Sequence, residues 1–222
     1  MLKLQLGMKK DRCLRVLCLG SHCDDIEIGC GGTILKLIGN YSYLIFYWVV
    51  FSSDRQRKNE ASESAKVFLK DVKEKNIVIK NFKDSFFPFG GAEIKEYFEE
   101  IKDKFLPDII FTHYRQDLHQ DHRLISELTW NTFRDHLILE YEIPKYDGDL
   151  GSPNLFVHLN ENLCQRKIKY ILGSFRTQRR NHWFNKETFE SMLRLRGMEA
   201  NAPERFAEAF YCRKLVCRLH ER

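Results

Sequence analysis

Four short apolar runs, each followed by a segment with helical spacing, constrain the fold of this chain most strongly. The runs lie within the predicted strands at residues 14–20, 43–51, 76–80 and 107–112. Runs of this length are typical of buried strands, and strands that alternate with helical segments indicate βαβ units and a parallel sheet. We therefore expect an α/β, three-layer Rossmann-like fold, in which a mostly parallel sheet is flanked by helices.

The remaining segments extend this alternation to the end of the chain. We expect helices at 26–39, 59–72, 92–105, 118–135, 161–175 and 186–195. Three further strands are expected at 137–143, 154–159 and 206–217. Because the chain has 222 residues, 43% of them hydrophobic, and no obvious linker, we expect a single domain over residues 1–222.

Charge and apolar content exclude several classes of protein. The net charge of +5 is spread along the chain, so we expect no nucleic-acid partner. The longest apolar run, 43–51, is far shorter than the ~20 residues of a membrane span. The first twelve residues lack the apolar core of a secretory signal, and the seven cysteines lack the spacing of a disulfide framework. These features predict a cytoplasmic protein with reduced thiols, and they leave a homo-oligomer open.

A first polar cluster, SHCDD at residues 21–25, directly follows the first apolar run. In open α/β sheets the carboxyl ends of the strands bind ligands, so His22, Asp24 and Asp25 are candidate site residues. Adjacent acids are also common at the start of a helix, which favours negative charge. This cluster alone therefore leaves both a catalytic and a structural role open.

A second cluster, HQDH at residues 119–122, follows the apolar run at 107–112. On a helix His119 and His122 are three positions apart and share a face. Asp121 lies beside them and could accept an imidazole N–H, which would favour a charged His119. Since parallel strands end at the same edge of a sheet, the two clusters together predict a site with three metal ligands. Two histidines and one carboxylate suit zinc or iron.

The two clusters resemble the motifs of the LmbE-like, or PIG-L, deacetylases. Residues 22–27 (HCDDIE) with Gly31 and Gly32 are similar to the His-Pro-Asp-Asp-Glu…Gly-Gly motif of that family, and residues 119–122 are similar to its His-x-Asp-His motif. Weaker similarities lie at Arg57-x-x-Glu60, at FRTQ (175–178) and at RFAEAF (205–210). The resemblance extends over residues 14–218.

The resemblance implies a zinc-dependent hydrolase that removes the acetyl group from a small-molecule N-acetyl sugar or sugar conjugate. By position, the metal ligands would be His22, Asp25 and His122. Asp24 would be the general base, His119 would stabilise the oxyanion or protonate the leaving amine, and Asp121 would orient His119. Bound zinc lowers the pKa of its water to about 7 and polarises a carbonyl, so a nearby carboxylate can take the proton of that water.

Residues outside the two clusters have less specific interpretations. Arg57 is a candidate for binding substrate oxygens, with a solvated surface position as the alternative. Asp117 is expected to cap the helix that follows it, with Gln120 as its capping-box partner. His113 follows a strand but is not assigned to the site, and the aromatic residues 86–89 are expected in the core rather than in a lid.

Two features in and after the first cluster are unusual at their positions. Cys23 stands where the family motif has Pro, and we expect it to be a half-buried spacer rather than a metal ligand. Gly29, Gly31 and Gly32 fall within a predicted helix, where each Gly costs roughly 1 kcal/mol relative to Ala. We expect them where the backbone closely approaches a ligand or a neighbouring strand.

Two other functions remain open at this point. One is a metal-dependent hydrolase of another amide or of an ester, because the same metal chemistry serves those bonds. The other is a non-catalytic Rossmann-like ligand-binding protein, which the glycines of residues 29–32 suggest. The third Gly of the dinucleotide-binding motif is missing, since Ile34 occupies its position.

Overall fold

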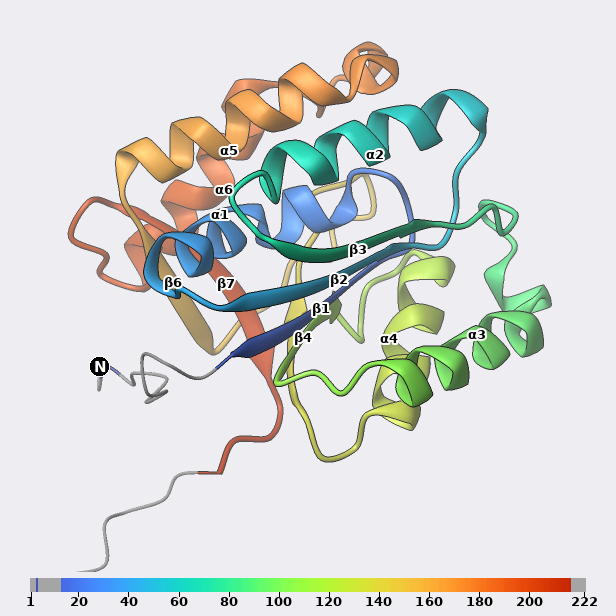
Figure 1. The fold of residues 1–222 in the computed structure, drawn as a ribbon. Helices are drawn as coiled ribbons and strands as arrows, with labels where there is room; N and C mark the ends of the chain where they lie inside the picture. Colours follow the sequence, from blue (N-terminus) through green and yellow to red (C-terminus); the bar gives the residue numbers. More distant parts are fainter. Residues whose placement is uncertain (1–2, 4–12, 217–222) are drawn as a thin grey trace, which may run out of the picture.

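The computed structural model describes residues 3 and 13–216 of the chain (Figure 1). The strands are β1 (Leu14–Gly20), β2 (Leu44–Val50), β3 (Glu74–Ile79), β4 (Ile109–His113), β5 (Leu137–Tyr141), β6 (Leu155–Leu159) and β7 (Phe206–Cys212). The α-helices are α1 (Asp25–Asn40), α2 (Arg55–Phe68), α3 (Gly91–Lys104), α4 (Gln120–Thr132), α5 (Glu161–Ser174) and α6 (Lys186–Glu199). Short 3₁₀ helices form η1 (Phe87–Phe89) and η2 (Arg176–Arg180). The expectation about a secretory signal concerns residues of which only residue 3 is described, and residue 217 of the last predicted strand also lies outside the described residues.

The seven strands form one sheet in the order β3-β2-β1-β4-β5-β7-β6. Strands β1 to β5 pair in parallel, whereas β7 is antiparallel to both β5 and β6. Each parallel step uses a helical crossover, as expected for βαβ units. The prediction of a mostly parallel α/β sheet is confirmed.

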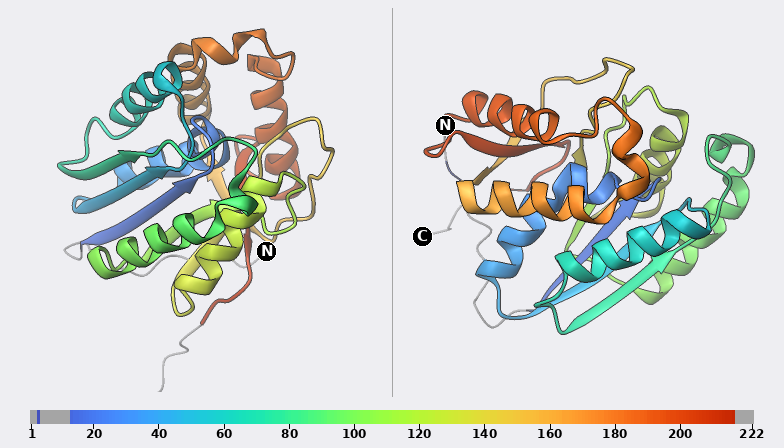
Figure 2. Two further views of the ribbon diagram at one scale, coloured as in Figure 1. Left: turned by 90° about the vertical axis from the view of Figure 1, so that its right-hand side faces the viewer. Right: turned by 90° about the horizontal axis from the view of Figure 1, so that it is seen from above.

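Helices cover both faces of this sheet. Figures 1 and 2 show α1, α2, α5 and α6 on one face and α3 and α4 on the other. Alternate residues of β1 enter the two cores: Val16 and Cys18 pack under α1 and α2, and Leu17 and Leu19 pack against α3 and α4. A strand that is apolar on both faces belongs in the middle layer of a three-layer fold, which explains the continuous apolar run at 16–20.

The glycines of α1 are explained by close packing. A Cβ on Gly29 would lie 2.2 Å from Cδ2 of Tyr141, and one on Gly31 would lie 2.7 Å from a ring carbon of Phe68. The Tyr141 hydroxyl donates to the carbonyl of Leu19 at 2.6 Å, so this ring is held in place. Of the two expected causes, the structure shows a close approach to the sheet and to a neighbouring helix.

Two helix starts differ from the sequence prediction because of capping. The helix expected at 59–72 begins at Arg55, since the Asp54 carboxylate accepts hydrogen bonds from the N–H groups of Gln56 and Arg57. The helix expected at 118–135 begins at Gln120, with His119 at its N-cap. The expectation that Asp117 caps this helix is therefore wrong.

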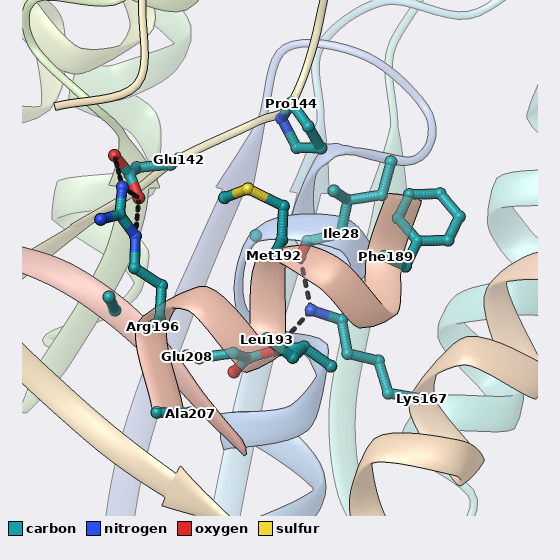
Figure 3. A pocket seen from close by; sticks show the side chains of 12 residues that line it. Ile28, Glu142, Pro144, Lys167, Phe189, Met192, Leu193, Arg196, Ala207 and Glu208 are labelled. Carbon is teal, nitrogen blue, oxygen red and sulfur yellow. Dashed lines mark hydrogen bonds and ion pairs between the residues drawn. The ribbon is translucent and has the colours of Figure 1, made fainter. Parts of the chain in front are cut away.

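A buried ion pair ties α5, β7 and α1 together. The Lys167 ammonium donates to Glu208 and to the carbonyl of Ile28, each at 2.6 Å, as Figure 3 shows. The Glu208 carboxylate also accepts the N–H groups of Gly32 and Thr33. This arrangement gives the Glu of the RFAEAF segment a structural role: it holds the helix that carries the first polar cluster.

Beside this ion pair lies a cavity of about 30 Å³, bordered by α6 and by the pair of Arg196 with Glu142 (Figure 3). That volume has room for a few water molecules. The cavity is bordered by Ile28 and Gly29 of α1 rather than by the His and Asp clusters, and we assign it to packing. Among the described residues, no helix is both long and apolar enough to cross a bilayer.

Candidate metal centre and active site

The two polar clusters meet at the carboxyl edge of the sheet because β1 and β4 are parallel neighbours. Val16 pairs with Ile109 and Cys18 with Phe111. Each strand then leads through a loop into a helix, β1 into α1 and β4 into α4. The left view of Figure 2 looks onto this edge. The imidazole rings of His22 and His122, far apart in the chain, have centroids 5.2 Å apart.

Three donor atoms form a compact triangle at this edge. His22 Nδ1 lies 3.2 Å from His122 Nε2, and Asp25 Oδ2 lies 3.6 Å from each of these nitrogens. All three residues are buried. A tetrahedral zinc with bonds of about 2.1 Å separates its ligand atoms by about 3.4 Å, so the triangle has the dimensions of one metal site.

The outward nitrogen of each imidazole in the triangle faces a carboxylate. His22 Nε2 is 3.2 Å from Asp121 Oδ2 and 3.2 Å from Asp84 Oδ1. His122 Nδ1 is 2.9 Å from Asp117 Oδ2. When the outward N–H donates to a carboxylate, the lone pair of the inward nitrogen is available, as in metal-bound histidines.

Burial and neighbouring charges shift the titration of this triangle. Burial opposes the charged form of His22, but hydrogen bonds to Asp121 and Asp25 hold the pKa of its imidazole well above the usual value. Burial and the neighbouring His113 lower the pKa of His122 to about 4. Although burial works against ionisation of Asp25, the nearby His122 and His113 hold the pKa of its carboxyl well below the usual range.

Asp24 and Arg57 lie beside the triangle. Asp24 is the N-cap residue of α1 but makes no capping hydrogen bond with its side chain, which leaves the carboxylate for other contacts. Burial and the adjacent Asp25 raise the pKa of Asp24 to about 6, although the charge of Arg57 opposes this. A group with a pKa near the working pH is well suited to accept and release a proton.

The Arg57 guanidinium lies between two carboxylates. Nη2 is 3.7 Å from Asp24 and Nη1 is 3.6 Å from Asp84, and within the described chain the buried Nε has no hydrogen-bond partner. Arg57 lies in the first turn of α2. This helix begins at Arg55, four residues before the expected start, because Asp54 caps it. Of the two positions expected for Arg57, the structure has the one at the site.

Asp121 and His119 are arranged differently from the expectation. The Asp121 carboxylate accepts the N–H groups of Ser85 and Phe87 and contacts His22. Only the backbone N–H of Asp121 reaches His119, donating to its Nδ1 at 3.2 Å. Asp121 therefore orients His22 and the loop before α3 rather than the His119 ring.

The expected charged form of His119 is also corrected. Burial and the nearby His22 lower the pKa of His119, and the carboxylate of Asp121 opposes this only in part. Because Nδ1 accepts the Asp121 N–H, the proton of the neutral ring lies on Nε2. His119 is thus a neutral donor, half-buried, with its ring centroid 4.6 Å from that of His122.

Three site residues were missed from the sequence. His113, the last residue of β4, accepts the N–H of Ser21 and lies 3.2 Å from Asp25 Oδ2. Because the Nε2 lone pair of His113 accepts the Ser21 N–H, His113 supports the triangle and is not a fourth metal ligand. Asp117 contacts His122 and stands only two positions before the HQDH cluster, so its place in the sequence could have suggested a role in the site. Asp84 follows β3 as a single acid in the aromatic loop before α3, and nothing in the sequence distinguished it.

Two further expectations have clear outcomes. Cys23 is fully buried, its thiol contacts the carbonyl of Ser52, and burial raises its pKa, so it remains a protonated spacer.

In the aromatic loop, residues 86–89, only Phe87 is buried, with its ring 6.1 Å from that of His22. Phe86 and Phe89 are exposed, so the expectation that the whole cluster belongs to the core is wrong.

Comparison with known proteins places this site in a family. Residues 17–133 match the PIG-L family, described as GlcNAc-PI de-N-acetylase, and this range contains both polar clusters. The fold is similar to a conserved protein from Thermus thermophilus, with a TM-score of 0.73, 18% identity, and coverage of 93% of this chain and 97% of that one.

Two further solved structures show what the fold alone can and cannot indicate. The N,N'-diacetylchitobiose deacetylase from Pyrococcus horikoshii is 22% identical, with a TM-score of 0.64 and coverage of 88% of this chain and 82% of that one. The 4-carboxy-2-hydroxymuconate hydratase GalB from Pseudomonas putida is 14% identical, with a TM-score of 0.70 and coverage of 94% and 99%. Because this fold serves both a deacetylase and a hydratase, the function must be argued from the family and from the site residues.

Proposed function

The chain belongs to the PIG-L family, and we propose that it removes the acetyl group from an N-acetylated amino sugar or its conjugate by metal-dependent hydrolysis. The observation that carries the proposal is the triangle of His22 Nδ1, Asp25 Oδ2 and His122 Nε2, with edges of 3.2, 3.6 and 3.6 Å. Two imidazoles backed by carboxylates and one buried carboxylate form the donor set of a hydrolytic zinc or iron site.

His22, Asp25 and His122 would hold the metal. When bound there, a divalent zinc or iron ion supplies Lewis acidity, which lowers the pKa of a bound water and polarises the acetamide carbonyl. Asp84 and Asp121 orient the His22 ring, and Asp117 orients the His122 ring, so both inward lone pairs face the same point.

Asp24 takes the proton of the attacking water. Its carboxylate is the one acid of the first cluster that is used neither in the triangle nor in a cap. Arg57 holds this carboxylate from one side and has an unused buried N–H at Nε, which suits it to bind a hydroxyl or carbonyl oxygen of the sugar.

His119 lies beside the proposed metal ligand His122 and can donate to the reacting carbonyl. With Nδ1 occupied by the Asp121 N–H, Nε2–H donates a hydrogen bond to the oxygen that becomes negatively charged in the tetrahedral intermediate. A neutral imidazole is a poor acid, so the proton for the departing amine comes from Asp24, which took it from the water. Another amide or an ester would present the same carbonyl oxygen to Nε2–H and would differ in its leaving group, so a substrate panel distinguishes these possibilities.

The proposal is tested by metal content and acetate release measured on the same samples. We expect one divalent metal per chain and acetate release from a panel of N-acetylglucosamine derivatives, with His122→Ala losing both. Asp24→Asn should keep the metal and lose turnover by about 10²–10⁴-fold, the usual loss for a general base. A metal-loaded wild-type protein that cleaves esters or other amides, but no N-acetyl sugar, would contradict the proposal.

The six described cysteines are free thiols, which fits the reducing cytoplasm. We therefore keep the cytoplasm as the proposed location. The proposed partner is the small-molecule sugar substrate itself.

A further inference from the structure

Five large exposed apolar side chains lie on the loops that border the metal centre. They lie on three loops at the carboxyl edge of the sheet: the loop before α3, the loop before α4 and the loop between β5 and β6. We call these side chains the apolar rim: Phe86, Phe89, Leu118, Tyr146 and Leu150. Phe89 is 82% exposed, Tyr146 76% and Leu118 58%. A gathering of this kind beside a site is more informative than single exposed apolar residues, which are common on any protein.

The rim is attached directly to the site. Phe86 lies between Ser85 and Phe87, whose N–H groups both donate to the Asp121 carboxylate. Leu118 lies between Asp117 and His119 in the sequence, and its own N–H donates to Asp149. These exposed side chains therefore belong to loops that are hydrogen-bonded or directly joined to the residues that orient the proposed metal ligands.

The third loop is joined to the same framework by charge. Lys145 lies 3.0 Å from the Asp117 carboxylate, which in turn orients His122, and it also pairs with Asp149. Tyr146 directly follows Lys145 in the sequence, and Leu150 directly follows Asp149. The left view of Figure 2 faces the edge of the sheet at which these loops lie.

Four cations near the rim already have partners, and one of them, Arg123, donates to the carbonyls of Asp117 and Leu118. Lys145 is bound to two carboxylates, Arg57 lies between two more, and the Lys83 ammonium lies 3.6 Å from the ring centroid of Phe86. An anionic group beside Lys145 or Arg57 would compete with the carboxylates that these cations already contact. An apolar group would instead remove exposed apolar surface from water, which is favourable in itself.

We propose that the apolar rim binds an apolar substituent, an alkyl or aryl group, carried by the N-acetyl sugar substrate. The occupant follows from continuity with the site, because an acetamide held between His119 and the metal triangle leaves the rest of the molecule at the surrounding loops. This inference rests on the proposed function and specifies the substrate class.

The test compares the methyl and octyl β-glycosides of N-acetylglucosamine, both below the concentration at which the octyl compound forms micelles. We expect kcat/KM for acetate release to be at least about tenfold higher for the octyl glycoside, since each buried methylene contributes several-fold. The double variant Phe89→Ser/Tyr146→Ser should lose most of this difference and keep the methyl rate. Leu106→Ser, a matched change at a residue that is 68% exposed at the amino edge of the sheet, should leave both rates unchanged.

Failure of the rim and failure of the proposed function give different results. Equal rates on the two glycosides, or an octyl preference that survives the double variant, would overturn the rim. No acetate from either glycoside would overturn the proposed function. In that case calorimetric titration of both glycosides still tests the rim, because octyl binding no tighter than methyl binding, or unaffected by the double variant, would contradict it.

Discussion

His119 combines two tasks in one side chain, and they can be separated. Its Nδ1 caps α4 by accepting the Asp121 N–H, and this bond places the ring proton on Nε2. The cap stabilises the helix, whereas only the Nε2–H can serve the reaction. Asn is also a good N-cap residue, but its side chain is too short to bring a donor to the carbonyl.

We predict different outcomes for His119→Asn and His119→Ala. Both should lower kcat by about 10²–10³-fold, the usual loss for one oxyanion donor. Only His119→Ala should also lower the free energy of unfolding, by about 1 kcal/mol, because it removes the cap. Steady-state kinetics and urea denaturation measure the two effects. Full activity of the Asn variant would show that another group stabilises the oxyanion.

His113 illustrates how a residue supports the centre without joining it. Its Nε2 accepts the Ser21 N–H, and its ring stacks on His122 with centroids 3.9 Å apart. These contacts fix the backbone before His22 and one face of His122 at once. His113 is therefore a positioning residue in this geometry.

At the scale of elements, α1 is the helix on which the site depends most. It begins at Asp25, so any displacement of α1 moves a proposed ligand. Its glycines allow the helix to lie directly on the sheet and on α2, and Gly29 faces Tyr141 at a distance that leaves no room for a methyl group. Near the other end of the helix, Gly39 has open space around it.

We predict opposite effects for alanine at these two glycines of the same helix. Gly29→Ala should destabilise the protein by about 1–3 kcal/mol, because the Tyr141 ring is held by its hydrogen bond to Leu19 and cannot yield freely. Gly39→Ala should stabilise it by about 0.5–1 kcal/mol, the usual gain for Ala over Gly in a helix. Urea unfolding monitored by circular dichroism measures both. Equal effects would mean that α1 shifts to accommodate the new methyl group.

Across the whole molecule, the late strand β7 fixes the early helix α1. Glu208 of β7 accepts two N–H groups of α1, and Lys167 of α5 neutralises it. Both side chains are almost completely buried. A buried charge without its partner is costly, so this pair links segments from the two ends of the described chain.

We predict that Glu208→Gln destabilises the protein by about 3–5 kcal/mol, because the Lys167 ammonium remains buried without a counter-charge. The double variant Glu208→Gln/Lys167→Met should recover part of this loss. As a control, Glu63→Gln breaks an exposed pair with Lys66 and should change stability by less than about 1 kcal/mol. A single variant as stable as the double variant would show that Lys167 finds another partner or loses its proton.

Several features followed from the sequence alone because they depend on local periodicity. Continuous apolar runs such as 16–20 identified the central strands, since a strand covered on both faces has no polar side. The HCDDIE and HQDH motifs identified the family, and the family match confirms that resemblance. Their position after neighbouring parallel strands was enough to expect His22, Asp25 and His122 at one edge of the sheet.

Only the tertiary structure decided which side chain contacts which. Asp121 orients His22 rather than its neighbour His119, because the loop at Ser85 and Phe87 holds the Asp121 carboxylate. The contacts of Arg57 with Asp24 and Asp84, and of His113 with Asp25, join residues that are distant in the chain. Hydrogen-bond partners over such separations depend on strand order and loop conformation, whereas sequence periodicity reports only a residue's immediate neighbours on its own helix or strand.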